Sequence, residues 1–368
     1  MKKRIVVLGT GFAAFRFLKK INTKLYDVSV ISPRNHFLFT PLLPETTVGS
    51  VEFRSIIEPV RNINDITYHQ SYCTNIDAAN KYVLCKDTDT QKEYRIAYDY
   101  LIIAVGEITN TFGIEGINEN ALFLKELADA RKIRTKVIDC FENASLPDIS
   151  QEEKRRFLRF AVCGGGPTGV EFAAELHDFI EDDVKRKYKD LADYVEIILI
   201  EAGSTLLASF DKKLSDYTMK IFKRQNIILK INSYVNKVDG KTIFLNDGTG
   251  FDYGLLVWAT GNASTPLVCN SGLKRDGRGK IITDRFFRVK TGQGYSDCIY
   301  AAGDCGVIEN YELPVTAQVA QKAGLYLAKL FNAGIDGVIQ LLFFSLVVWQ
   351  LTFFERKKVV LLLFNIFL

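Results

Sequence analysis

A glycine-rich turn near the middle of the chain constrains its fold more than any other feature. Residues 164–169 read GGGPTG, a complete GxGxxG pattern between the apolar run 160–163 and a helix-like stretch at 170–179. In such a strand–turn–helix unit the first glycine allows the tight turn, the second lets backbone approach a pyrophosphate, and the third lets helix and strand pack closely. The pattern therefore predicts a dinucleotide site with the pyrophosphate at a helix N-terminus. Its three glycines are Gly164, Gly166 and Gly169.

An acidic residue follows the next expected strand. Residues 195–200, VEIILI, are expected to form that strand, and Glu201 comes directly after it. A carboxylate at this place accepts hydrogen bonds from the adenosine ribose and repels the 2′-phosphate of NADPH, so it favours NADH. Glu201 lies 32 residues after Gly169, further than the usual distance of about 20, because a polar helical insertion at 181–189 intervenes. The alternative is a solvated acid at a strand end.

A second copy of the same pattern opens the chain. Residues 9–14 read GTGFAA between an apolar run at 5–8 and a helix-like stretch at 12–20, and Ala14 takes the third glycine position, which the pattern tolerates. No acid follows the next strand at 28–31, so Ser32 or a backbone group must recognise the ribose there. A single glycine-rich turn of this kind can also occur without binding a nucleotide. Two copies predict two nucleotide sites, the first involving Gly9, Gly11, Ala14 and Ser32.

Three further apolar runs end on a residue that can lie close to a cofactor, two on glycine and one on an acid. Residues 100–106 and 254–261 end on glycine, as expected where backbone passes close to a cofactor, which adds Ala104, Gly106 and Gly261 to the candidates. The third run, 298–304, ends on Asp304, which can accept hydrogen bonds from a ribityl chain or can simply cap a loop. The order predicts an α/β fold with two Rossmann-like domains, the second inserted in the first. The expected ranges are 1–154, 155–275, 276–332 and an apolar tail at 333–368.

Composition excludes several classes of function. The formal net charge is only +4, with 47 Lys and Arg scattered among 43 Asp and Glu, so no nucleic-acid partner is expected. The seven cysteines are odd in number and form no CxxC, which favours reduced thiols. The three histidines stand apart, so no metal site is expected. The N-terminus, with Lys2, Lys3 and Arg4 leading into a strand, shows no secretory segment.

The tail needs its own interpretation. Residues 337–354 contain no charged residue, residues 355–358 read ERKK, and a second apolar run continues to Leu368. The alternatives are a membrane-spanning helix, an interfacial or disordered apolar tail, and a buried strand. The first two give membrane contact.

Together these motifs resemble the type II (alternative, rotenone-insensitive) NADH dehydrogenases, flavoproteins of the pyridine nucleotide-disulfide oxidoreductase superfamily. The resemblance runs from about residue 4 to residue 331. It rests on VLGTGFA at 7–13, SPRNHFLFTPLLP at 32–44, VCGGGPTGVEFA at 162–173, AAGDC at 301–305 and LPVTAQVA at 313–320.

The resemblance implies that the first module binds FAD, with contacts that include Pro33, Arg34 and Asp304, and that the inserted module binds NADH. It places Gln318 near the isoalloxazine ring and the quinone, and Glu171 near flavin and nicotinamide; these two are the candidate catalytic residues. One departure concerns the quinone motif AQxAxQ. Here Lys322 occupies the second glutamine position and Gln321 comes one position early.

The implied activity is a non-proton-pumping NADH:quinone oxidoreductase. We expect a membrane quinone as partner, contacted by Gln318, Gln321 and Lys322. We also expect peripheral attachment to the mitochondrial inner or the bacterial cytoplasmic membrane, with a homodimer as one candidate assembly. A disulfide reductase would need the absent CxxC, and the second glycine turn argues against a sulfide:quinone reductase. A non-catalytic or degenerate redox-sensing flavoprotein remains an alternative, since the chain stops soon after the resemblance ends.

Overall fold

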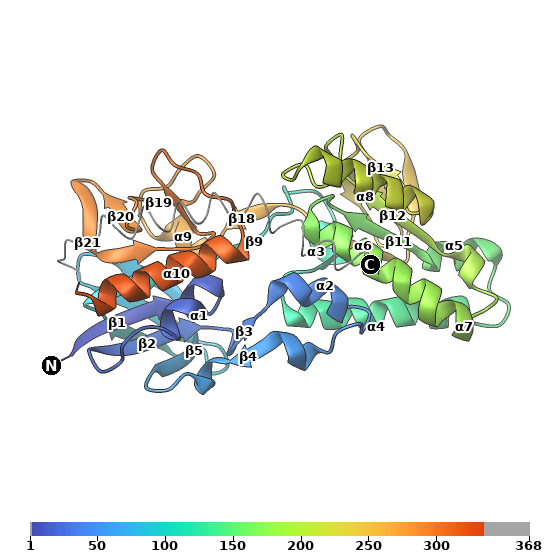
Figure 1. The fold of residues 1–368 in the computed structure, drawn as a ribbon. Coiled ribbons are helices and arrows are strands. Elements are labelled where there is room, and N and C mark those ends of the chain that lie inside the picture. The colour runs from blue at the N-terminus through green and yellow to red at the C-terminus, as the bar shows by residue number, and fades with distance from the viewer. Residues whose placement is uncertain (1, 335–368) are drawn as a thin grey trace. The chain divides into compact units, whose positions relative to one another are not determined.

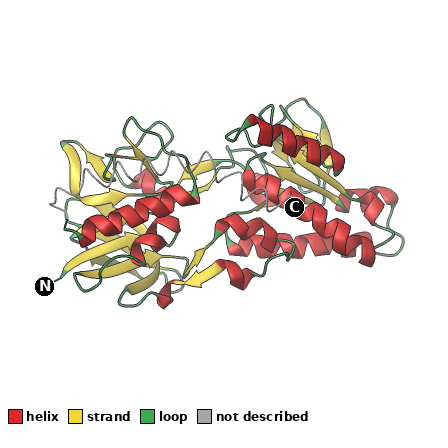
Figure 2. Ribbon diagram, in the orientation of Figure 1, coloured by secondary structure: helices red, strands yellow, loops and turns green. Residues whose placement is uncertain are grey.

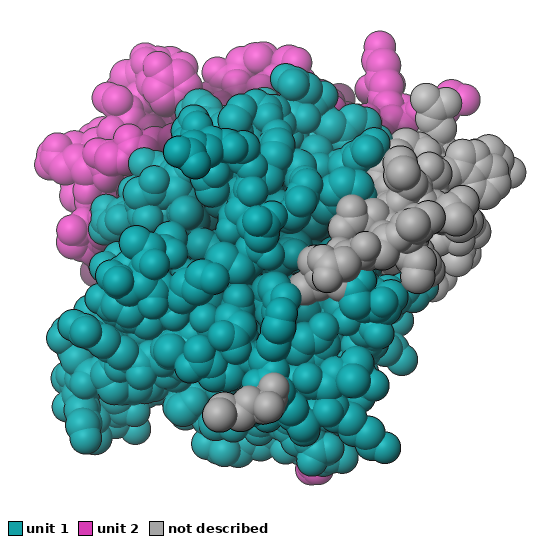
Figure 3. All heavy atoms as spheres, turned by 90° about the vertical axis from the view of Figure 1, so that its left-hand side faces the viewer, with its two compact units in different colours: residues 1–37, 58–107, 263–368 teal, residues 38–57, 108–262 magenta. Residues whose placement is uncertain are grey.

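The computed structural model describes residues 2–334, and the chain divides into two compact units. Unit 1 comprises Met1–Phe37, Glu58–Glu107 and Ala263–Leu368, and unit 2 comprises Leu38–Ile57 and Ile108–Asn262 (Figure 3). All four points at which the chain passes from one unit to the other lie within short strands. These strands are β3 (His36–Leu38), β4 (Ile57–Pro59), β9 (Glu107–Thr109) and β18 (Asn262–Ser264).

Unit 1 is built on a ten-stranded mixed sheet. At its centre β1 pairs in parallel with β2 and β8, and β8 pairs in parallel with β21. The strand order is β22 (Gly306–Ile308), β19 (Ile281–Thr283), β20 (Arg288–Thr291), β21 (Gly294–Ala301), β8 (Tyr100–Ile103), β1 (Lys3–Leu8), β2 (Tyr26–Ser32), β5 (Thr67–Asp77), β6 (Tyr82–Asp87) and β7 (Glu93–Ala97). The four apolar residues at 5–8 are at most 1% exposed, because parallel strands are covered on both faces.

Two helices of unit 1 lie side by side over this sheet, α1 (Phe12–Leu18) and α10 (Ala317–Asn332), as Figure 1 shows. Their contact is close because Gly324 of α10 has no side chain. A Cβ at that position would overlap the backbone carbonyl of Ala13. The N-terminal ends of both helices thereby lie in the same unit as the loops that follow β1 and β21.

Unit 2 is built on a five-stranded parallel sheet. The strand order is β10 (Leu122–Phe123), β17 (Leu255–Trp258), β11 (Arg159–Cys163), β12 (Glu196–Ile200) and β13 (Ile228–Lys230). Its main helices are α4 (Leu127–Ala144), α6 (Pro167–Phe179) and α8 (Lys212–Arg224), and each contacts strands of this sheet. An antiparallel sheet of β14 (Val235–Val238), β15 (Thr242–Leu245) and β16 (Gly250–Asp252) completes the unit. Figure 2 shows these strands and helices in separate colours.

The remaining elements are short. The polar insertion before β12 is helical, as expected: α6 continues into a π-helical turn, η4 (Ile180–Val184), and α7 (Lys185–Lys187). The other short helices are η1 (Thr40–Leu42), α2 (Leu43–Thr46), η2 (Phe53–Ile56), η3 (Val60–Asn62), α3 (Ile117–Asn120), α5 (Gln151–Phe157), η5 (Ala192–Tyr194) and α9 (Pro266–Asn270).

The predicted α/β class is confirmed. The compact units and the expected domain ranges have different bounds: residues 108–154 pack within unit 2, where α4 contacts α5, β10 and β17, and residues 263–275 fall in unit 1. The ranges as nucleotide-binding domains stay a prediction. The apolar tail lies outside the described residues. Within residues 2–334, none of the helices combines the length and the apolar character needed to cross a bilayer.

Candidate functional site

The glycine turn of unit 2 connects β11 to α6 and has three different backbone environments. Gly164 has φ +121°, and a Cβ there would lie 2.6 Å from the carbonyl oxygen of Ala259. A Cβ at Gly169 would overlap the carbonyl oxygen of Gly164. At Gly166, the N-cap residue of α6, a Cβ would meet no atom within 4 Å. Two glycines are thus fixed by packing, and the middle one faces free space at a helix N-terminus.

That free space is suited to a phosphate group. Backbone N–H groups in the first turn of an α-helix lack intrahelical partners, and the helix dipole favours an anion there. The middle glycine leaves room for the anion to reach those donors. The local geometry therefore fits the pyrophosphate of a dinucleotide.

Glu201 lies beside this turn at the end of β12. Its Oε2 accepts a hydrogen bond from the backbone N–H of Gly165, and its Oε1 accepts one from Gly203, both at 2.6 Å. These bonds fix the orientation of the carboxylate, and each oxygen keeps a further lone pair for a ribose hydroxyl. Gly261, after β17, has φ +76° and packs against the carbonyl of Asn110, which also accepts from the Trp258 indole at 3.0 Å.

The glycine turn of unit 1 repeats this geometry between β1 and α1. Gly9 has φ +105°, and a Cβ there would overlap the carbonyl oxygen of Ala104, as one at Gly164 would crowd Ala259. Gly11 is the N-cap residue of α1 and faces free space, with no atom within 4 Å of an added Cβ. Ala14 is fully buried in the third position. The two turns therefore match position by position, which the sequence copies predict.

Ser32 occupies the place at the end of β2 where Glu201 stands in unit 2. Its buried hydroxyl lies 3.1 Å from the hydroxyl of Thr10 and accepts from the backbone N–H of Arg34 at 3.2 Å. Thr10 also donates to the Arg34 carbonyl at 3.2 Å. Ser32 thus joins the glycine turn to the loop that holds Pro33 and Arg34, and its contact with a ribose stays a prediction.

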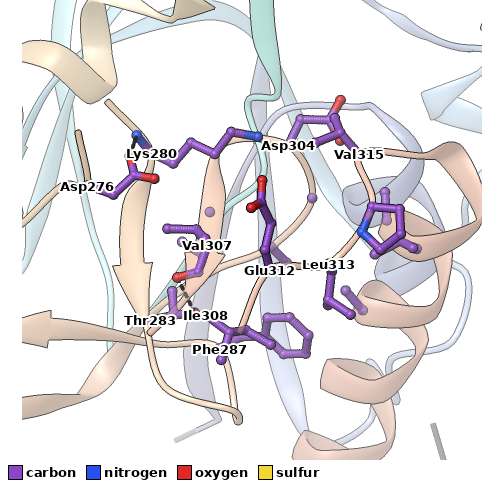
Figure 4. A pocket seen from close by; sticks show the side chains of 18 of the residues that line it. Asp276, Lys280, Thr283, Phe287, Asp304, Val307, Ile308, Glu312, Leu313 and Val315 are labelled. Carbon is purple, nitrogen blue, oxygen red and sulfur yellow. Dashed lines mark hydrogen bonds between the residues drawn. The ribbon is translucent and has the colours of Figure 1, made fainter. Parts of the chain in front are cut away.

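Asp304 follows β21 and lines a cavity of about 240 Å³ in unit 1 (Figure 4). The cavity wall is apolar where Phe287 and Val319 line it and charged where Lys280 extends toward Asp304. Lys280 Nζ lies 3.2 Å from Glu107 Oε1, and the two side chains are 11% and 5% exposed. This buried ion pair was not predicted from the sequence, because its two members are far apart in the chain and belong to no motif.

The first turns of α10 bring the three candidate quinone residues together. Thr316 caps the helix by accepting from the backbone N–H of Val319 at 3.3 Å. Gln318 is exposed, while Gln321 and Lys322 are half-buried. Residues three and four apart share one face of a helix, so these side chains form a polar face on the N-terminal end of α10.

Three carboxyl groups gather between α2 and α6 in unit 2. Burial first, then the carboxylates of Glu45 and Glu175, raises the pKa of Glu171 to about 8. Burial also raises the pKa of Glu45 to about 7, and Glu45 Oε2 has no hydrogen-bond partner among the described residues. The Ser50 hydroxyl donates to Glu175 Oε2 at 2.6 Å. Glu171 was predicted as a site residue, whereas Glu45, which lies one residue beyond the motif at 32–44, was not.

Known proteins match this chain over most of its length. The model of the pyridine nucleotide-disulphide oxidoreductase family matches residues 3–324. The chain belongs to this family. It is 47% identical over 335 residues to a probable NADH dehydrogenase of Dictyostelium discoideum, an alignment that covers 90% of this chain and 73% of the relative.

Two further comparisons point the same way. An Arabidopsis thaliana protein named external alternative NAD(P)H-ubiquinone oxidoreductase B2, mitochondrial, is 42% identical over 359 residues, covering 92% of this chain and 61% of the relative. The solved structure of Plasmodium falciparum NDH2 in complex with NADH has 34% identity and a TM-score of 0.87, covering 92% of this chain and 85% of that one. The predicted resemblance to type II NADH dehydrogenases is confirmed. The chain spans about three fifths of the length of several such relatives.

Proposed function

We propose that this chain is an FAD-dependent, non-proton-pumping NADH:quinone oxidoreductase. The observation that carries the proposal is the pair of matching glycine turns, each with its middle glycine facing free space at a helix N-terminus. Only the turn of unit 2 has an acid, Glu201, fixed beside it. One turn is therefore suited to NADH and the other to a second dinucleotide, FAD.

This assignment determines which residues would contact each cofactor. When bound, FAD accepts a hydride from NADH and passes electrons to an acceptor. In unit 1 the FAD contacts would be Gly9, Gly11, Ala14, Ser32, Pro33, Arg34, Ala104, Gly106, Asp304 and Gln318. In unit 2 the NADH contacts would be Gly164, Gly166, Gly169, Glu171, Glu201 and Gly261. The protein's task is to orient both cofactors, so few reacting side chains are needed.

Two groups of side chains support the reduction of the quinone to a quinol. The polar face of α10 supplies the Gln318 amide as a hydrogen-bond donor to a quinone oxygen, and the Lys322 ammonium would stabilise negative charge on a reduced quinone. Forming a quinol consumes one proton from solution for each NADH. Glu171, with its pKa of about 8, holds a proton at neutral pH and is suited to release it when charge develops nearby.

The names of the relatives suggest an electron acceptor and a cellular location for this chain. Several relatives are named ubiquinone oxidoreductases and mitochondrial, so we propose ubiquinone as acceptor and the surface of the mitochondrial inner membrane as the site of action. A bacterial cytoplasmic membrane is the alternative. Peripheral attachment and a homodimer are part of the same proposal.

Steady-state assays of the FAD-loaded protein test this function. We expect NADH oxidation that depends on a soluble ubiquinone analogue, and no quinone reduction when sulfide replaces NADH. Reduction driven by sulfide would instead identify a sulfide:quinone reductase. Tight flavin binding without turnover with either donor would identify a degenerate or redox-sensing flavoprotein.

A further inference from the structure

Two cysteines stand directly opposite each other in the sheet of unit 1. Cys73 lies on β5 and Cys85 on β6, and the antiparallel register of the two strands makes their Cα atoms partners. Side chains in direct register lie on the same face of a sheet, with Cβ atoms about 4.5–5.5 Å apart. Both cysteines are free thiols. The β5–β6 hairpin thus brings together two thiols that are twelve residues apart in the chain.

The hydrogen bonds of this ladder bring the pair especially close. The backbone N–H of Thr88 donates to the carbonyl of Gln70 at 3.3 Å, so residues 70 and 88 form a hydrogen-bonded pair. Hydrogen-bonded and non-hydrogen-bonded pairs alternate along an antiparallel ladder, so Cys73 and Cys85, three positions further, form a non-hydrogen-bonded pair. The Cα atoms of such a pair lie about 4.5 Å apart. This separation is at the short end of the range of roughly 4.4–6.8 Å that disulfides span.

The two thiols differ in their access to solvent. Cys85 is fully buried in an apolar cluster that includes Val83 and Ile103, whereas Cys73 packs against that cluster and is partly exposed. The Cys73 thiol donates to the carbonyl oxygen of Asn75 at 3.5 Å, which is a weak bond for a sulfur donor. A small oxidant in solution therefore reaches Cys73 first, and Cys85 is in place to react with the oxidised sulfur.

The environment of the pair makes its chemistry slow. Burial raises the pKa of the Cys85 thiol to about 12, and burial followed by the neighbouring Cys85 raises that of Cys73 to about 12. Because the thiolate is the reactive form, both groups react slowly at neutral pH. A catalytic dithiol instead has a lowered pKa. The pair is therefore suited to respond to lasting oxidation and not to turn over with each catalytic cycle.

We propose that Cys73 and Cys85 close to an intramolecular disulfide when the protein is exposed to hydrogen peroxide. The Cys73 sulfur attacks the O–O bond, an S–O bond forms, and one oxygen leaves as water, which converts Cys73 to a sulfenic acid. The Cys85 sulfur then attacks the Cys73 sulfur, the S–S bond forms, and the sulfenic hydroxyl leaves as a second water. The two thiols lose two electrons and two protons, and the peroxide gains them.

The disulfide should be reversible. A Cα separation at the short end of the disulfide range strains the bond, and strained disulfides are more easily reduced. The bond would tie β5 to β6, and β5 also pairs with β2, where Gln70 is the partner of Ser32. The Tyr68 hydroxyl of β5 donates to the Ser32 carbonyl at 3.0 Å. Oxidation would therefore restrain a strand that supports the end of β2.

Peptide mapping of the full-length, FAD-loaded protein tests the proposal. The peroxide dose is raised until Cys269, an exposed cysteine, is oxidised. Remaining thiols are then alkylated and the protein is cut with trypsin, which cleaves after Lys81 and leaves the two cysteines on separate peptides, 62–81 and 82–86. We expect both alkylated peptides to be lost together and a linked peptide to appear, lighter than their sum by two hydrogen atoms. Dithiothreitol should restore both thiols.

Three variants assign the roles of the sulfurs. Cys85→Ala, which keeps the buried position apolar, should stop the reaction at the Cys73 sulfenic acid, and the sulfenic acid probe dimedone should label it. Cys73→Ser should give no linked peptide. Cys298 lies in the same apolar cluster and is also partly exposed, so it is the alternative partner. Cys298→Ser is the matched control and should form the Cys73–Cys85 link as wild type does.

Several results would overturn the proposal. These are a link between Cys73 and Cys298 in place of Cys85, loss of the link in Cys298→Ser, and wild-type Cys73 and Cys85 that both remain open to alkylation. The test uses neither NADH nor quinone, so its outcome is independent of the proposed function. A protein that forms the link but never oxidises NADH would keep the disulfide site and lose the function. An active protein without the link would lose the disulfide site alone.

Discussion

Burial first, and the neighbouring carboxylate of Glu45 second, raise the pKa of Glu171 to about 8. Glu45 itself has a pKa of about 7 and lies on α2, which packs against the helix that carries Glu171. Two neighbouring carboxyl groups, one buried and one half-buried, cannot both ionise at low cost, so the pair keeps a proton near neutral pH. The stability of the fold should therefore fall as the pH rises through these two pKa values.

Both groups bind protons more tightly in the folded chain than in the unfolded chain, where their pKa is 4.5. Stability from these groups is therefore complete below pH 4.5 and is lost as the pH rises toward 7 and 8. Glu45→Gln removes one ionisable group. It should stabilise the protein on the order of 2 kcal/mol near pH 8.5 and little near pH 5. Thermal midpoints at the two pH values check this, and an equal gain at both would contradict it.

The two middle glycines provide a matched pair of variants. Because a Cβ at Gly166 or Gly11 meets no protein atom within 4 Å, valine at either position should leave the fold intact and project into the phosphate site. Gly166→Val should keep bound flavin and lose reduction by NADH, and Gly11→Val should lose the flavin. Absorbance spectra and NADH titrations check both. Loss of flavin from a folded Gly166→Val protein would mean that the two modules are assigned in the wrong order.

Glu201 should set the preference for NADH over NADPH. Its carboxylate is held beside the glycine turn by Gly165 and Gly203, where it would repel a 2′-phosphate. Glu201→Ser should reduce the ratio of kcat/KM for NADH to kcat/KM for NADPH by about tenfold or more. Removal of a charge–charge repulsion of about 1.4 kcal/mol is sufficient for that factor. An unchanged ratio would show that the carboxylate only braces the turn.

Gln318 should act in electron exit and not in hydride entry. Because it is exposed on the first turn of α10, Gln318→Leu removes a polar contact without opening a cavity in the core. Anaerobic reduction by NADH should stay near the wild-type rate, and reoxidation by quinone should slow at least about tenfold, the value of one good hydrogen bond. Lys322→Gln, which restores the AQxAxQ pattern, serves as the comparison. Equal slowing of both half-reactions in stopped flow would identify Gln318 as a structural residue.

Local patterns predicted the parts of this protein that depend on neighbouring residues. Each glycine turn directly follows its strand in sequence, and Glu201 directly follows the next strand of its unit. The structure has the turns at these strand ends and Glu201 hydrogen-bonded to Gly165. Glu45 and the pair Lys280–Glu107 were missed, because their environments arise from segments far apart in the chain. The packing of α4 in unit 2 was missed for the same reason, since its apolar face is recognisable only against the sheet that covers it.

The most direct test of the central claim follows the flavin spectrum of the purified, FAD-loaded protein through both half-reactions. Under anaerobic conditions one equivalent of NADH should bleach the visible absorbance of the oxidised flavin. A soluble ubiquinone analogue added afterwards should restore it. Flavin that NADH does not bleach, or bleached flavin that quinone does not restore, would contradict the assignment of this chain as an NADH:quinone oxidoreductase.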